Sequence, residues 1–187
     1  MSQTCQPIRA YLPHPLDPLS SEELTLAVEI IREQAQLDPR ALFEQIRLRE
    51  PEKSLVHQFV AGNNIEREAF AVILDRNADK VYEAVVRLND ATLQSFTWVP
   101  GVRVCTLAEE ATEMQEVVRQ HPDFIAGLKR RGIENIQQVL VEAFAVANLA
   151  EPDEKDLRHT RAHCFYVENP GDNTYARPVE GLVPVVD

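Results

Sequence analysis

The chain has 187 residues, of which 44% are hydrophobic, so it can hold one ordinary domain or two small ones with hydrophobic cores. Thirty acidic residues against 19 basic ones give a formal net charge of -11, which repels nucleic-acid phosphates and anionic membrane surfaces. This balance argues against a nucleic-acid partner and against a membrane partner.

Targeting signals and cysteine pairs are both missing from the sequence. No apolar run approaches the roughly 20 residues of a transmembrane helix, and the first 20 residues lack the basic start and apolar centre of a signal peptide. We therefore expect a cytoplasmic protein. Cys5, Cys105 and Cys164 are widely spaced and form no CxxC pair, which predicts neither a disulfide framework nor a zinc site.

The first half of the sequence predicts one helix followed by strands. The helix is expected to begin after Ser20, because Ser20 and Glu23 have the spacing of a capping box, and to end before Asp38-Pro39. Short turn-forming segments would let the strands pair antiparallel. Strands are predicted at 42–48, 68–75, 80–88 and 92–99, and a short helix ended by Gly62 is one interpretation of 51–64.

After Pro100-Gly101 the same order restarts. Thr106 and Glu109 repeat the capping-box spacing and predict a helix that ends before Pro122. Pro122 would then begin a second helix, with Gly132 as its left-handed cap. Strands are predicted at 138–147, 158–168 and 182–186, with a charged surface loop at 148–156.

The repeated order predicts an α+β protein of two units, each a helix packed on an antiparallel β-sheet, with a boundary near Pro100-Gly101. Each unit would have about 85 residues, and a unit of that size buries only about 60% of its unfolded surface. Packing of one unit on the other would therefore stabilise both.

Several runs in the chain resemble the N-terminal domains of copper-containing amine oxidases. The runs at 14–24, 48–56, 69–90 and 99–102 resemble the second N-terminal domain, which we assign to residues 1–100. The runs at 121–133 and 172–183 resemble the third, which we assign to residues 101–187. The last of these, DNTYARPVEGLV, is the most specific motif. The resemblance implies that each unit is cystatin-like, with a helix first and antiparallel strands after it.

The resemblance also carries expectations about cofactors. In the family a large C-terminal β-sandwich carries three histidines that hold copper, a tyrosine converted to topaquinone, and an aspartate base. No run in this chain resembles that domain. We therefore expect no cofactor in this chain, because copper and topaquinone would belong to a separate catalytic domain.

The residues themselves predict no catalytic or metal site. The family's copper site needs an HxH pair and a third histidine, and no HxH occurs here. His163 and Cys164 are neighbours in a predicted strand, so their side chains should point to opposite faces and could not act as a catalytic pair. No GxSxG, GxGxxG or Walker pattern occurs. The histidines are His14, His57, His121, His159 and His163.

These observations lead to one functional hypothesis and its rivals. We expect a non-catalytic accessory or split subunit of a copper and topaquinone primary-amine oxidase, acting with a separate catalytic chain. By the resemblance, Tyr175 would line the substrate channel or face the partner, although packing of its own loop is an equal alternative. A stand-alone binding or interaction module that kept the fold without oxidase activity, a homo-oligomer, and a fragment of a longer gene product are the alternatives.

The resemblance finally implies one further strand after the equivalent of residues 182–186. We therefore expect the second sheet to have three strands here, with 182–186 at its edge. An open edge presents unpaired N–H and C=O groups, and proline at such an edge removes one donor. Pro184 is therefore expected to hinder pairing of the open edge with another chain.

We predict that the two units unfold in one transition, because each is small and the resemblance implies a face shared between them. Calorimetry of the whole chain, and of a shorter chain that ends near Gly101, tests this prediction. Equal stability of the first unit in both samples would show that the second unit contributes nothing to it.

Overall fold

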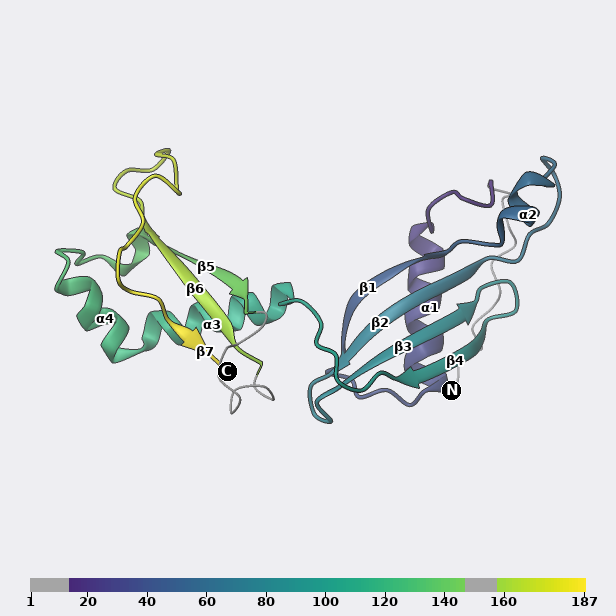
Figure 1. The fold of residues 1–187 in the computed structure, drawn as a ribbon, viewed down its shortest axis with the longest axis horizontal. Coiled ribbons are helices and arrows are strands. Elements are labelled where there is room, and N and C mark those ends of the chain that lie inside the picture. The colour runs from purple at the N-terminus through teal and green to yellow at the C-terminus, as the bar shows by residue number, and fades with distance from the viewer. Residues whose placement is uncertain (1–13, 147–157) are drawn as a thin grey trace. The chain divides into compact units, whose positions relative to one another are not determined.

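A computed structural model describes residues 14–146 and 158–187, which form two compact units (Figure 1). The first unit ends at Val104 and the second runs from Cys105 to Asp187. Each consists of helices packed on an antiparallel sheet, which confirms the predicted α+β class. The predicted loop at 148–156 and Cys5 lie outside the described residues. No helix in the described ranges is long and apolar enough to cross a bilayer.

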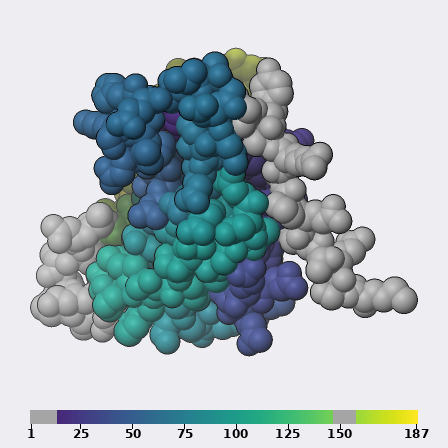
Figure 2. All heavy atoms as spheres, turned by 90° about the vertical axis from the view of Figure 1, so that its right-hand side faces the viewer, coloured from purple at the N-terminus to yellow at the C-terminus, as the bar shows by residue number. Residues whose placement is uncertain are grey.

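The first unit contains one long helix on a sheet whose four described strands pair in chain order (Figure 1). The short α2 interrupts the connection from β1 to β2 and has no buried residue, and it ends well before Gly62. In the space-filling view of Figure 2 this segment, in blue, forms the upper end of the visible face. The elements are α1 (Ser21–Gln34), β1 (Leu42–Arg49), α2 (Lys53–His57), β2 (Glu68–Asp75), β3 (Lys80–Arg87) and β4 (Thr92–Trp98).

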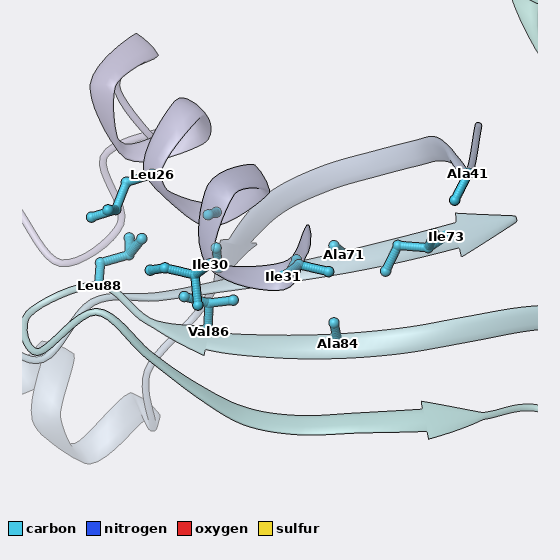
Figure 3. Packing of buried hydrophobic residues seen from close by; sticks show 11 residues of the cluster. Leu26, Ile30, Ile31, Ala41, Ala71, Ile73, Ala84, Val86 and Leu88 are labelled. Atoms are coloured by element: carbon cyan, nitrogen blue, oxygen red, sulfur yellow. The ribbon is translucent and has the colours of Figure 1, made fainter. Parts of the chain in front are cut away.

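The core of the first unit lies between α1 and the inner face of its sheet (Figure 3). Ile30 and Ile31 are fully buried there, each contributing about 2 kcal/mol of hydrophobic stabilisation. Every second residue of β2 points to the helix, as a strand's alternation requires. Ala71 and Ala84 are cross-strand partners at the centre of this face, and their small side chains leave room for the isoleucines.

The predicted capping box of α1 is confirmed and is part of a larger arrangement. The Glu23 N–H donates to Ser20 Oγ at 3.2 Å, and the Ser20 N–H donates to Glu23 Oε2 at 2.8 Å. Arg67, which directly precedes β2, donates from Nε to Glu23 Oε1 at 2.6 Å and from Nη2 to Glu23 Oε2 at 2.9 Å. Its Nη2 also donates to the carbonyls of Asp17 and Pro18. The guanidinium thus joins the helix, the sheet and the incoming chain, and its side chain is only 6% exposed.

The second unit repeats the helix and strand order with a smaller sheet. Two helices pack on β5, β6 and β7, which pair antiparallel in that order in the described residues (Figure 1). The predicted helices and the order of the strands are confirmed, but β7 is much shorter than the predicted range 182–186. The elements are α3 (Ala108–Gln120), α4 (Pro122–Lys129), the 3-10 turn η1 (Ile136–Gln138), β5 (Val139–Ala145), β6 (Thr160–Tyr166) and β7 (Val185–Val186).

The predicted cap of the second long helix is wrong by one residue. Its N-cap is Leu107, not Thr106, and the Leu107 N–H donates to Glu110 Oε2 at 2.9 Å. Leucine has no side-chain acceptor, so the glutamate alone provides the side-chain cap. Arg158, two residues before β6, donates from Nε and Nη2 to the two Glu110 oxygens, both at 2.6 Å, and also to the Cys105 carbonyl. The glutamate–arginine arrangement of the first unit therefore recurs in the second.

The position of Pro184 corrects the expected role of this proline. β7 is at the edge of the sheet, as predicted. However, the Pro184 carbonyl accepts from the Ala162 N–H at 2.9 Å, so Pro184 faces β6. Because the N–H and C=O of one strand residue point to the same side, the donor that proline lacks is one that would face Ala162, not the open edge. Pro184 shortens the ladder with β6 and does not hinder pairing at the outer edge.

We expect Glu23→Gln to lower the free energy of unfolding of the first unit by about 3 kcal/mol, because it leaves the buried Arg67 guanidinium without a neutralising charge. Chemical denaturation followed by circular dichroism measures the loss. Glu33→Gln removes the same charge from an exposed position of α1 and should change stability by less than about 0.5 kcal/mol. Equal effects of the two substitutions would contradict the role given to the ion pair.

The same variant should change the response to acid. Burial raises the pKa of Glu23, but hydrogen bonds from Arg67 and from the Ser20 N–H outweigh it and hold the pKa below the ordinary value of 4.5. Since the pKa is lowered in the folded state, the carboxylate stabilises the fold above pH 4.5, and this contribution is lost as the pH falls through the folded-state pKa. The free energy of unfolding of the Glu23→Gln variant should therefore fall less than that of the parent chain as the pH is lowered below 4.5.

Candidate functional site

The loop between β6 and β7 contains the most specific motif of the sequence, and it returns to the sheet before β7 begins. Its backbone pairs with β6 on the side that β7 also occupies. The Tyr166 N–H donates to the Arg177 carbonyl and the Val179 N–H donates to the Cys164 carbonyl, each at 2.8 Å. The loop from 169 to 176 therefore projects from a neck that is fixed to the central strand.

Between this neck and β7 the chain leaves the sheet and is tied to α4. Arg131 donates from Nε to the Glu180 carbonyl at 2.9 Å and from Nη2 to the Gly181 carbonyl at 3.0 Å. Its Nη1 donates to the Gly127 carbonyl at 2.8 Å. Leu182 packs so closely on α4 that a Cβ at position 127 would lie 2.9 Å from Leu182 Cδ1. Sequence reasoning missed Arg131, because its partners lie about 50 residues further along the chain.

Tyr175 lies on the projecting loop and is 55% exposed. Its ring makes a T-shaped contact with Phe165 of β6, with ring centroids 5.2 Å apart. Its hydroxyl donates to Glu142 Oε2 of β5 at 3.4 Å, which is a long hydrogen bond. Tyr175 thus packs on the sheet, while about half of its side-chain surface remains exposed to solvent. Its role at a channel or partner stays a prediction.

The outer face of the second sheet, which points away from its core, carries a row of aromatic rings. Phe144 of β5 lies 4.6 Å from the ring of His163, and it is 47% exposed. His163 and Phe165 are on the same side of β6, and Phe165 meets Tyr175. Exposed aromatic surface of this kind is typical of interaction sites, because large rings bury much area at little entropic cost.

An apolar groove of about 530 Å³ runs between the helices of the second unit and its last residues. Phe124 of α4, Leu182 and Val185 line it. Val117, also in the lining, is 53% exposed, whereas Ile30 at the same position of α1 is buried. In the first unit a further strand, β4, packs beside the helix, so the equivalent helix face is covered there.

Metal and thiol chemistry find no support in the described residues. No three His, Cys, Asp or Glu side chains gather closely enough to hold a metal ion in residues 14–146 and 158–187, so these residues do not fit a copper site. His163 is exposed and Cys164 is buried, as expected for neighbours in a strand. Burial raises the pKa of the Cys164 thiol to about 11, which keeps it protonated at neutral pH.

The sequence matches two domain families in succession. Residues 14–98 match the copper amine oxidase N2 domain, and residues 109–187 match the copper amine oxidase N3 domain. The chain is 34% identical over 175 residues to a primary amine oxidase of Arthrobacter sp., which covers 93% of this chain and 26% of that enzyme. It is 29% identical to a primary amine oxidase of Klebsiella aerogenes over 94% of this chain and 23% of the enzyme.

A solved structure shows the same fold. The copper-containing benzylamine oxidase from Hansenula polymorpha superposes with a TM-score of 0.69 at 23% sequence identity. The match covers 92% of this chain and 28% of that protein. The chain thus spans about a quarter of the length of the relatives that it matches.

We expect Arg131→Met to lower the free energy of unfolding of the second unit by about 2 kcal/mol, since it removes three hydrogen bonds to carbonyls. Amide exchange at residues 180–186 should become faster in the same variant. Arg130→Met is the matched control, because the Arg130 side chain makes none of these bonds and is exposed. Unchanged exchange in Arg131→Met would show that the contact with α4 does not hold this segment.

Proposed function

Because the chain belongs to the copper amine oxidase family as an N2 domain followed by an N3 domain, we propose that it is a non-catalytic part of a copper-dependent primary-amine oxidase. The observation that carries the proposal is the succession of the two domain matches across nearly the whole described chain. In this proposal the chain acts with a catalytic domain carried on another polypeptide.

The described residues support a binding role more than a chemical one. Their histidines, cysteines and carboxylates do not gather into a metal site, and the buried thiol of Cys164 is held protonated. What the second unit offers instead is exposed aromatic surface beside a loop with a fixed neck. Such a surface suits contact with a protein or with an apolar part of a substrate.

Copper and topaquinone, when held by the catalytic domain, would supply the oxidation of a primary amine to an aldehyde. The residues of this chain would take no part in that oxidation and would only help to position the amine or the catalytic domain. The loop that carries Tyr175 would lie against the catalytic domain, at the route by which the amine enters. Tyr175, with half of its surface exposed and its ring held by the sheet, is the residue that we assign to that contact.

We expect the purified chain to show no amine oxidase activity and no quinone absorbance, and to lose copper on dialysis against a chelator. Native co-purification from the source organism should recover a second, histidine-rich chain with quinone absorbance and activity towards primary amines. Stoichiometric copper retained by the isolated chain would contradict the assignment.

The same experiment separates the rival functions. Recovery of the chain alone, or as a homo-oligomer without any oxidase activity, would replace the proposal by a stand-alone interaction module. Detection of the chain as part of one longer polypeptide that also carries the quinone would show that the two parts are not separate subunits.

A further inference from the structure

The loop 169–176 is closed at its neck by contacts of three kinds. The Tyr166 N–H donates to the Arg177 carbonyl at 2.8 Å, in the ladder of the sheet. The Arg177 guanidinium pairs with the Glu168 carboxylate across the base of the loop. Gln138 donates from Nε2 to the Glu168 carbonyl at 2.9 Å and so ties the outgoing strand to the start of β5. The two ends of the loop are therefore held together and to the sheet.

Within the loop, side chains form two successive turns. The Asn169 N–H donates to Asp172 Oδ2 at 3.1 Å, and the Asp172 N–H returns a bond to the Asn169 carbonyl at 3.1 Å. The Tyr175 N–H donates to Asn173 Oδ1 at 3.0 Å, which is the Asx-turn pattern. Gly171 has a φ of +95°, a conformation that L side chains rarely adopt. These bonds fix the backbone before Tyr175, and the bond from the Tyr166 N–H to the Arg177 carbonyl fixes it afterwards.

The ring of Tyr175 then meets two residues from different strands. Phe165 of β6 touches it at an interplanar angle of 77°, so the edge of one ring meets the face of the other. Glu142 of β5 accepts a hydrogen bond from the Tyr175 hydroxyl at 3.4 Å. Glu142 is half-buried in the middle of its strand, opposite His163. The ladder with β6 fixes the backbone of Glu142, and from there its carboxylate reaches the Tyr175 hydroxyl.

We propose that Glu142 is a positioning residue for Tyr175, and that with Phe165 it makes the loop 169–176 a preformed recognition element, not a mobile lid. The proposal rests on the proposed function only for what Tyr175 recognises; the positioning itself concerns this chain alone. A preformed aromatic side chain loses little conformational entropy on binding, so the contact with the catalytic domain would gain affinity from it. Loosening Glu142 should therefore weaken binding without changing the chemical step of the partner.

The test compares Glu142→Ala and Glu142→Gln in the full chain. Nitration of tyrosine rings by tetranitromethane, read residue by residue by mass spectrometry, reports how freely Tyr175 reacts. We expect Glu142→Ala to raise the nitration rate of Tyr175 and the amide exchange of residues 169–176 by about threefold, the scale of one hydrogen bond. Glu142→Gln keeps a hydrogen-bond acceptor, so its nitration and exchange rates should stay close to those of the parent chain. Tyr82 and Tyr166 serve as internal references, since both are half-buried in strands.

Two further variants complete the test. Glu134→Ala removes an exposed carboxylate of the second unit and should leave Tyr175 unchanged. Phe165→Leu keeps apolar bulk but loses the ring contact, so it tests the same position if Glu142→Ala does not fold. Nitration and exchange at Tyr175 that match the parent in both variants would overturn the proposal, whatever the function of the chain.

A second measurement separates this inference from the proposed function. In the complex recovered with a quinone-containing chain, Glu142→Ala should raise the KM for the amine or the Kd of the complex by about threefold, with kcat unchanged. A freed Tyr175 with an unaltered KM and Kd would uphold the positioning role of Glu142 and remove Tyr175 from the proposed contact with the catalytic domain.

Discussion

A glutamate at the third position of a helix, paired with an arginine just before a strand, organises each unit of this protein. Glu23 uses its carboxylate both to cap α1 and to bind Arg67, and Arg67 also holds the chain that leads into the helix. Because Arg67 directly precedes β2, this one contact places the helix start over the start of the strand. The alternation of β2 then turns its alanines towards the helix. Glu110 and Arg158 repeat the arrangement in the second unit.

A second pair of arginines holds the other end of each helix. Arg32 and Arg119 occupy the same position of α1 and α3, and each donates to carbonyls where the first strand of its sheet begins, at Ala41 and at Val139. The helix is thus fixed to the sheet at both of its ends by guanidinium groups. Hydrophobic packing between them can then be small in area, as it is in units of this size.

Local signals in the sequence predicted the helices, most strands and the pairing order, because capping residues, prolines and alternation act over a few residues. The start of α3 was misplaced because Thr106 matched the capping pattern, whereas the structure uses Glu110 with a leucine cap. Long-range contacts were beyond such signals. Arg131 binds carbonyls about 50 residues away, and Glu142 meets Tyr175 across two strands. Tyr175 itself was identified only through its motif, and its contacts with Phe165 and Glu142 could not be predicted from the sequence.

The connection from β1 to β2 lies largely outside the core of the first unit. The ends of these strands pair at Arg49 and Glu68, so the residues between them leave the sheet and come back to the same place. Within them α2 has no buried residue, and Leu55 and Val60 are exposed. Surface segments of this kind are where chains tolerate cleavage and insertion. A peptide tag or a fluorescent protein inserted next to α2, away from the buried Arg67, should therefore leave the helix, the sheet and their shared core intact.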